Sequence, residues 1–293
     1  MSDHWTNYWQ QGHLTSFGGG FKTNYEGELK NFWQRFADNI AEHSSVLDIG
    51  TGNGALIELI QKNHDFNCVG VDKALIHKDY INSVKGELLS GVSAEILPFE
   101  SSRFDYVISQ FAIEYTNIDK SLEEVIRVLK NKRNFVFICH HPESVIIKSN
   151  QEILNISNEI KSKLLTSLNV LARALVEEDH DLINSSFEFI DTFTFERCGN
   201  IHGLKGTNLL SFVDFLKKNQ GKKIRFVEAF KLFQKELELL ILRLQELTQA
   251  ADNLPLIINK LNQENIDLEV GYIREDKSST LLACFLYAKA TKF

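Results

Sequence analysis

Residues 46–55 have the sequence VLDIGTGNGA. It begins as a short apolar run, passes through a turn with three closely spaced glycines, and continues into ALIELIQKN, which has helical spacing. Glycines in such a turn let backbone amides approach a ligand, because no Cβ stands in the way. The N-terminus of the helix that follows favours a carboxylate or a phosphate at the same place. The stretch therefore predicts a nucleotide-like ligand at the turn.

From residue 45, short apolar runs alternate with helical stretches as far as residue 140. After residue 140 the alternation stops, and it resumes near the C-terminus with LPLIINKL, IDLEVGYI and LLACFLYAKA, which indicate a helix and two closing strands. Short β-branched and aromatic runs separated by amphipathic helices are typical of a parallel sheet covered on both faces. The predicted fold is α/β, with a doubly wound, mostly parallel seven-stranded sheet and a helical insertion after the fifth strand.

This pattern divides the chain into three parts. Residues 1–28 form an N-terminal flap without a clear period, residues 29–142 and 253–293 form a Rossmann-like core, and residues 143–252 form a mainly helical lid. The flap is rich in aromatic residues, namely Trp5, Tyr8, Trp9, Phe17 and Phe21. Within the insertion, heptad-like spacing over 230–247 is shorter than a coiled coil requires, so it favours a self-packed lid over a dimer seam. The chain is expected to be a monomer or a homodimer.

Composition disfavours several other classes of protein. A formal net charge of -7 and a pI near 5.8 give no basic surface for a phosphate backbone, so nucleic acid is not the expected partner. No apolar run approaches the ~20 residues that span a bilayer, and the first residues lack a secretory pattern, so a cytoplasmic protein without membrane contact is expected. The cysteines are far apart and are expected to be buried free thiols without a metal; they are Cys68, Cys139, Cys198 and Cys284.

The glycine turn alone is compatible with two classes of enzyme. Through Gly50, Gly52 and Ala55 it satisfies a loose G-x-G-x-x-G/A pattern, which is also found in nicotinamide-dependent oxidoreductases. Asp48, two residues before the first glycine, can accept hydrogen bonds from an ammonium group. Together with a third glycine at Gly54 and the segment AEILPF at the predicted end of the third strand, it favours a different cofactor.

On these residues the chain resembles the class I S-adenosylmethionine-dependent methyltransferases, whose motif reads D/E-x-G-x-G-x-G. The resemblance covers residues 45–140 and, less closely, the C-terminal strands. It implies S-adenosyl-L-methionine as cofactor, with Gly50, Thr51 and Gly52 around its methionine part beside Asp48. It also implies that the acidic residue closing the second strand, Asp72, binds the ribose hydroxyls, with Lys73 next to it.

Further site residues are expected after the third, fourth and fifth strands. The resemblance implies that Ala94 and Glu95 contact the adenine, and that Gln110 and Phe111 lie between cofactor and acceptor. An aromatic face at Phe111 can also attract the sulfonium.

Two candidate catalytic residues lie at the same edge of the sheet. Tyr115 follows the fourth strand and His140 follows the fifth, at the carboxyl edge where open α/β sheets bind ligands. A histidine there can accept the proton of an acceptor near neutral pH. No metal is expected at this site.

The predicted function is methyl transfer from S-adenosylmethionine to an O or N atom of a small-molecule acceptor by in-line displacement. Such a reaction needs alignment of the nucleophile and the methyl group in a dry pocket, which the flap and the insertion could together enclose. Two alternatives stay open on the sequence. One is an NAD(P)-dependent oxidoreductase, and the other is a non-catalytic cofactor-binding or interaction protein with the same fold.

Overall fold

The computed structural model describes residues 4–16, 23–130, 134–264 and 266–288. The chain divides into two compact units. The first, here called the sheet unit, contains Met1–Val145 and Gln249–Phe293, and the second, the helical unit, contains Ile146–Thr248. Phe17 and Phe21 of the predicted flap lie outside the described residues.

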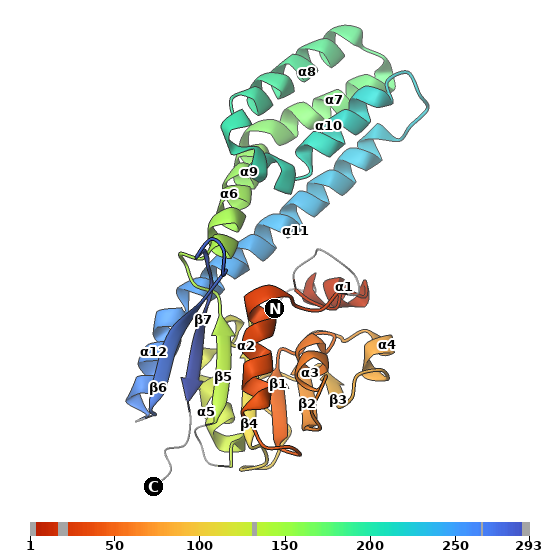
Figure 1. Cartoon of the computed structure of the whole chain (residues 1–293). Helices are drawn as coiled ribbons and strands as arrows, with labels where there is room; N and C mark the ends of the chain where they lie inside the picture. The colour runs from red at the N-terminus through yellow and green to blue at the C-terminus, as the bar shows by residue number, and fades with distance from the viewer. Residues whose placement is uncertain (1–3, 17–22, 131–133, 265, 289–293) are drawn as a thin grey trace. The chain divides into compact units, whose positions relative to one another are not determined.

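The sheet unit is built on seven strands in the order β3-β2-β1-β4-β5-β7-β6 (Figure 1). The first five strands run parallel, whereas β7 pairs antiparallel with β5 and β6 pairs antiparallel with β7. Their bounds are β1 Ser45–Ile49, β2 Asn67–Asp72, β3 Glu87–Ser90, β4 Tyr106–Gln110, β5 Phe135–Cys139, β6 Leu268–Arg274 and β7 Leu281–Ala288. The predicted fold class is confirmed.

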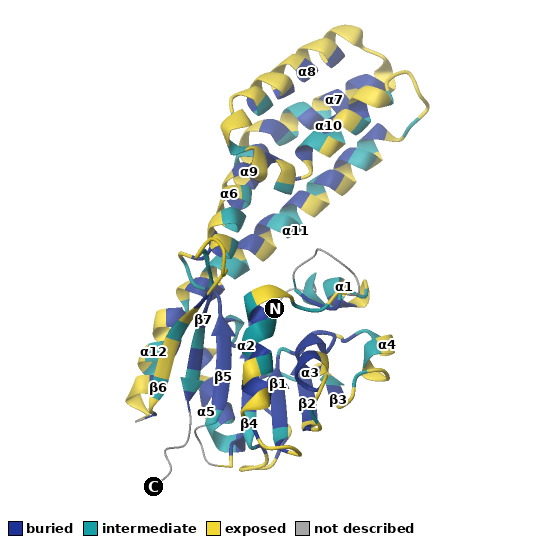
Figure 2. Cartoon of the chain, viewed as in Figure 1, coloured by how far each residue is buried: buried dark blue, intermediate teal, exposed yellow. Residues whose placement is uncertain are grey.

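Helices cover both faces of this sheet. On one face, α5 and α12 contribute to the main apolar core, and on the other α2 packs beside α3. The helices of this unit are α1 His4–Gln10, α2 Gly27–Asp38, α3 Ala55–Ile60, α4 Lys78–Ile81, α5 Ile118–Val128 and α12 Leu254–Gln263, with a 3-10 turn at Ile113–Tyr115. The central strands β1, β4 and β5 are deeply buried between these layers (Figure 2), which explains their nearly continuous apolar sequences.

Three local expectations were wrong. The sequence after the second strand predicts a helical stretch to about Val84, but the structure has only the single turn α4 there. The third strand ends at Ser90, so AEILPF lies in the loop after it. The flap residues from Trp5 to Trp9 were expected to be irregular, but they form the short helix α1. Seven residues are too few to display the apolar period from which a helix is recognised in sequence.

The helical unit has a core of its own. Its helices are α6 Val145–Glu159, α7 Leu165–Glu177, α8 His180–Phe195, α9 Ile201–Gly206, α10 Leu209–Lys218 and α11 Phe226–Asp252. A π-helical turn at Ile160–Leu164 connects α6 to α7, and a 3-10 turn at Cys198–Asn200 lies between α8 and α9. Apolar residues of these helices form one cluster separate from the core of the sheet unit. Apolar residues at helical spacing predict two long helices in this part of the sequence, over 153–175 and 230–247. Both are confirmed, apart from the π-helical turn.

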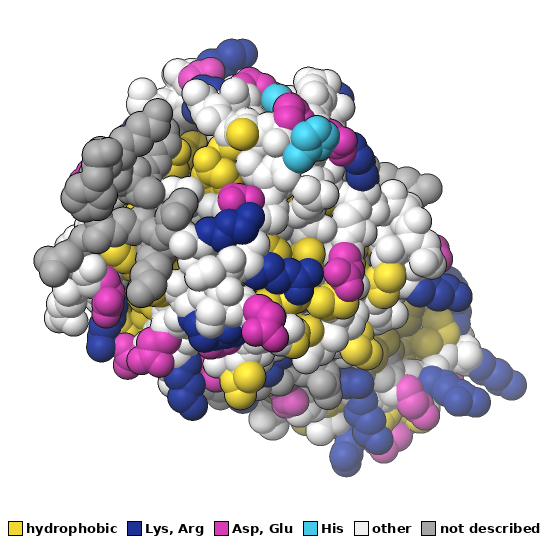
Figure 3. Space-filling model, turned by 90° about the horizontal axis from the view of Figure 1, so that it is seen from below, with side chains coloured by type: hydrophobic (Ala, Val, Ile, Leu, Met, Phe, Trp, Pro, Cys, Tyr) yellow, Lys and Arg dark blue, Asp and Glu magenta, His cyan; other side chains and the backbone are white. Residues whose placement is uncertain are grey.

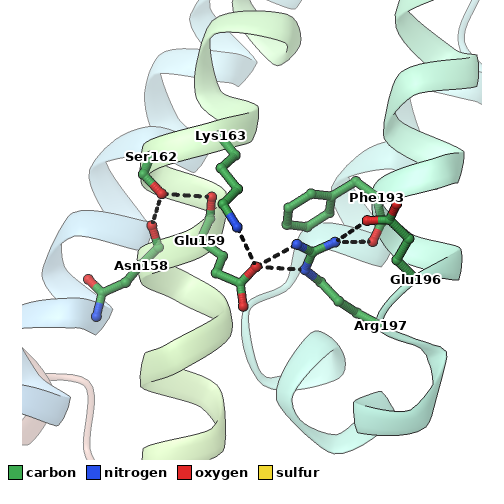
Figure 4. Close-up of polar contacts among 7 residues, drawn as sticks. All are labelled: Asn158, Glu159, Ser162, Lys163, Phe193, Glu196 and Arg197. Carbon is green, nitrogen blue, oxygen red and sulfur yellow. Dashed lines mark hydrogen bonds and ion pairs between the residues drawn. The ribbon is translucent and has the colours of Figure 1, made fainter.

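An ion-pair cluster joins the π-helical turn of this unit to the end of α8 (Figure 4). The guanidinium of Arg197 donates to the carboxylate of Glu159, and Lys163 also pairs with that carboxylate. The Arg197 guanidinium also donates to the carbonyl oxygen of Phe193 at 2.8 Å and lies 3.7 Å from the centre of its ring. Arg197 holds the pKa of Glu159 below its usual range. The cluster therefore connects the end of α6 to the segment after α8 through charge-assisted hydrogen bonds.

The surface carries charges of both signs. On the face shown in Figure 3, Lys and Arg side chains are interspersed with Asp and Glu. Within the described ranges, no helix is both long and apolar enough to cross a membrane, and no cluster of His, Cys, Asp and Glu has metal-site geometry. The expectation of four buried cysteines was wrong for Cys198, which is exposed beyond the end of α8.

Candidate functional site

The glycine turn is held against the end of β2 by the backbone. The amides of Gly50 and Thr51 both donate to the carbonyl oxygen of Val71, at 2.8 and 3.0 Å. Gly50 and Gly52 have φ values of 72° and 54°, in the left-handed region that glycine adopts without strain. A Cβ on Gly50 would lie 2.1 Å from the Cβ of Ala112, so the turn and the segment after β4 approach more closely than a side chain allows.

Two aspartates line the cavity at this turn. Asp48 is 1% exposed, and its Oδ2 atom has no hydrogen-bond partner within the described part of the chain. Asp72 accepts the amide of Gly52 at 2.8 Å through one oxygen and the amide of Ala74 at 2.8 Å through the other. Burial raises the pKa of Asp48 to about 7 and that of Asp72 to about 6, and the charge of Asp72 also raises the pKa of Asp48.

The predicted cofactor residues converge on one cavity. All of them except Gly52 line it, namely Asp48, Gly50, Thr51, Asp72, Lys73, Ala94, Glu95, Gln110 and Phe111. Gly52 contributes its amide to Asp72 rather than a surface to the cavity. The parallel register of β1, β2 and β4 explains the convergence, because it places the carboxyl ends of these strands side by side.

The two predicted catalytic residues lie in different places. Tyr115 lines the cavity, whereas His140 is 4% exposed and is not part of the lining. The His140 ring lies behind Phe111, with ring centres 4.2 Å apart. His140 is therefore separated from the cavity by Phe111.

Helix α1 covers the glycine turn. Trp5 and Trp9 line the cavity, and a Cβ on Gly52 would lie 2.6 Å from the indole of Trp9. The side-chain amide of Asn53, at the turn itself, donates to the carbonyl oxygens of Trp9 and His13 at 3.0 and 2.7 Å. Gln10 donates in turn to the loop after β2. The N-terminal segment is thus attached to the same residues that shape the cofactor site.

Sequence reasoning missed two supporting residues. Trp33 is fully buried in α2, and its indole N–H donates to the Oε1 atom of Gln110 at 2.6 Å, which fixes the orientation of that amide in the cavity wall. Tyr25 also lines the cavity, and burial raises the pKa of its hydroxyl. Trp33 appeared in sequence only as one member of an apolar helical stripe, and no local motif marks Tyr25.

The residues present fit S-adenosylmethionine. The buried Asp48 Oδ2 without a partner suits an ammonium donor, and the carboxylate of Asp72 keeps lone pairs for two hydroxyls beyond its two backbone amides. Aromatic faces from Trp5, Phe111 and Tyr115 line the same cavity, and such faces suit a cation. Thus the donors and acceptors that the resemblance implied occur together in one place.

Comparison with known proteins gives the same class. Residues 47–137 match the family described as a methyltransferase domain. This domain is of the class I type that depends on S-adenosyl-L-methionine, and its match runs from β1 through the glycine turn to β5.

Several individual proteins match part of the chain. An uncharacterized methyltransferase of Bacillus subtilis is 31% identical over 150 residues, which cover 46% of this chain and 55% of that protein. A sarcosine/dimethylglycine N-methyltransferase of Aphanothece halophytica is 33% identical over 103 residues, covering 32% and 37%. A solved structure of a methyltransferase from Aquifex aeolicus is 20% identical, covers 39% of this chain and 65% of that chain, and has a TM-score of 0.33. The chain spans about half the length of the curated relatives it matches.

The raised pKa values predict how cofactor affinity depends on pH. An ammonium at Asp48 and hydroxyl donors at Asp72 favour the ionised carboxylates, so the dissociation constant of S-adenosylhomocysteine should fall as the pH rises from about 5.5 to about 8. Calorimetric titration across this range measures it. An Asp48→Asn variant should bind more weakly with a flatter profile, and a wild-type affinity that is constant or falls with pH would contradict the assignment.

The same shifts have a consequence for the stability of the free protein. Both pKa values exceed the roughly 3.9 of an unfolded aspartate. The contribution of these two groups to the stability of the fold is therefore fully present below that pH. Their contribution is lost as the pH rises through about 6 and then about 7. Without cofactor, Asp48→Asn should therefore raise Tm more at about pH 8 than at about pH 5.

Proposed function

We propose that the protein transfers a methyl group from S-adenosylmethionine to an O or N atom of a small-molecule acceptor by in-line displacement. The observation that carries the proposal is the cavity in which Asp48 and Asp72 face the glycine turn beneath Trp5 and Trp9. The name of the Aphanothece halophytica relative describes N-methylation of sarcosine and dimethylglycine. This similarity favours a nitrogen atom over an oxygen atom as the acceptor.

The chain's own residues supply binding, orientation and exclusion of water. Asp48 and Asp72 would hold the polar ends of the cofactor, whose sulfonium supplies an activated methyl group when it is bound. Gln110, held by Trp33, presents an amide to the same cavity. Tyr115 lines the cavity. We propose that it orients the acceptor or accepts the proton that the acceptor loses. Alignment rather than covalent chemistry is the main requirement of this reaction.

The test is transfer of a labelled methyl group. The purified protein is incubated with methyl-tritiated S-adenosylmethionine and two matched panels, one of small amines and one of small hydroxyl compounds. Formation of S-adenosylhomocysteine that depends on an acceptor is expected. Binding of the cofactor without transfer to any acceptor would favour the non-catalytic alternative, and binding of NAD in place of S-adenosylhomocysteine would favour an oxidoreductase.

The N-terminal segment provides a further prediction. Deletion of residues 1–20 removes Trp5 and Trp9 from the cavity, so it should lower the transfer rate by at least about tenfold while Tm falls by only a few degrees. The comparison of initial rates and Tm between the two proteins measures both effects. Trp5→Ala is the milder matched variant, because Trp5 lines the cavity, whereas Trp9 also lies against Gly52.

Protease protection distinguishes a flap from a structural cover. If α1 closes over a bound ligand, S-adenosylhomocysteine should protect the segment from cleavage. Full turnover by the truncated enzyme, with protection unchanged by the ligand, would show that the flap has no part in transfer. Closure of the pocket by the helical unit stays a prediction from the sequence.

A further inference from the structure

A buried ionisable pair lies directly behind the cavity. Glu114, in the 3-10 turn after β4, is 0% exposed, and His140, which follows β5, is 4% exposed. The Oε1 atom of Glu114 accepts the backbone N–H of His140 at 3.0 Å and lies 2.9 Å from its Nδ1. The carbonyl oxygen of Glu114 accepts the side-chain amide of Asn253 at 2.9 Å. The pair therefore links the ends of β4 and β5 to the start of α12.

Burying such a pair is costly. A buried carboxylate is destabilising unless its oxygens are hydrogen-bonded, and the Oε2 atom of Glu114 has no such partner among the residues that the structure describes. An apolar pair of similar volume would fill this space without that cost. The cost suggests a role other than stability.

Both aromatic residues that the pair touches belong to the cavity wall. The His140 ring packs against Phe111 at 4.2 Å, tilted by 33°, and meets Tyr115 edge to face at 6.0 Å. Phe111 has a φ of 54°, a left-handed conformation that a bulky residue keeps only when its surroundings impose it. Its backbone N–H donates to the carbonyl oxygen of Ile138 at 2.7 Å. Phe111 is thus held from two sides in a strained conformation, with its ring in the cavity wall.

We infer that Glu114 and His140 are positioning residues for methyl transfer, acting through Phe111 and Tyr115. The Glu114 carboxylate fixes the plane of the His140 ring, and that ring supports the two aromatic side chains that line the cavity. This inference rests on the proposed function, because it assigns the pair to the reaction rather than to cofactor binding. It replaces the role of proton acceptor that the sequence predicted for His140.

The test compares turnover, affinity and stability in three variants. His140→Asn keeps a polar group near Glu114 but removes the ring behind Phe111 and Tyr115, and Glu114→Ala removes the oxygen that orients the ring. Each should lower kcat by at least about tenfold while the dissociation constant of S-adenosylhomocysteine changes by less than about threefold. Glu114→Gln keeps an acceptor oxygen for the His140 amide and should restore most of the lost kcat.

A matched control separates positioning from stability. Asp105, just before β4 and so at the opposite end of that strand from Gln110, accepts hydrogen bonds from Ser45 and Lys130. Asp105→Asn should lower Tm without lowering kcat. If Glu114→Ala does not fold, His140→Asn with Glu114→Gln decides the question.

The outcomes distinguish this inference from the function on which it rests. If the wild-type protein transfers methyl groups and the folded His140→Asn variant has the same kcat, the inference is wrong but the proposed function stands. A parallel loss of cofactor affinity, or a loss of kcat that merely follows Tm as in the control, would also overturn it. A wild-type protein that binds the cofactor but transfers no methyl group would defeat the proposed function, and the inference with it.

Discussion

Gly52→Val is expected to abolish measurable binding of S-adenosylhomocysteine, raising its dissociation constant by at least about 100-fold. Gly52 has a φ of 54°, which a β-branched residue rarely adopts, and its amide donates to Asp72. The added Cβ would also lie 2.6 Å from the Trp9 indole. Valine should therefore displace the turn, its bond to Asp72 and the helix above it together. Calorimetric titration measures the affinity.

Two further variants assign the cause of that loss. Gly221→Val meets the same left-handed backbone, with φ of 71° but nothing within 4 Å of the added Cβ, so it should cost stability and leave binding intact. The double variant Gly52→Val with Trp9→Ala removes the clash with the indole. We expect it to recover stability but not affinity. Near wild-type affinity in either Gly52 variant would show that the loop is only a structural turn.

Asp72→Ala is expected to weaken S-adenosylhomocysteine binding by ~1.5–3 kcal/mol, the range for hydrogen bonds to a charged group. The sequence predicts that Asp72 ends its strand facing water or ligand, so that its loss leaves the fold intact. In the structure it is half-buried and accepts two backbone amides, so the variant should also lose some stability. Titration together with thermal unfolding separates the two effects.

Asp79→Ala is the matched control for this variant. Its carboxylate belongs to α4, the helix that follows β2, but it is 76% exposed and is not among the residues that line the cavity. It should change neither affinity nor Tm appreciably. An unchanged dissociation constant for Asp72→Ala would instead show that another residue binds the ribose hydroxyls.

The sheet and the glycine turn could be predicted because their signals are local. The strand ending at Ile49, the glycines after it and the helix from Ala55 are each determined by neighbours in sequence, and parallel strands bury both faces. The same logic located Asp72 and Gln110, because each closes a strand of that sheet.

The contacts that shape the cavity walls could not be predicted in this way. Trp33 bonds to Gln110 across 77 positions, and Glu114 meets His140 across 26. Asn53 holds Trp9 across 44 positions. Such pairs depend on the packing of whole elements, and one sequence carries no periodic signal for them. For this reason the sequence predicts the edge of the sheet at which His140 lies, but not that its side chain is behind the cavity wall instead of in the cavity.

The central claim is that the cavity at the glycine turn binds S-adenosylmethionine. Calorimetric titration of the wild-type protein with S-adenosylhomocysteine, and separately with NAD and NADP, tests it most directly. We expect saturable binding of S-adenosylhomocysteine at one site, lost in Gly52→Val, with no binding of either nicotinamide cofactor. Binding of NAD or NADP without binding of S-adenosylhomocysteine would contradict it.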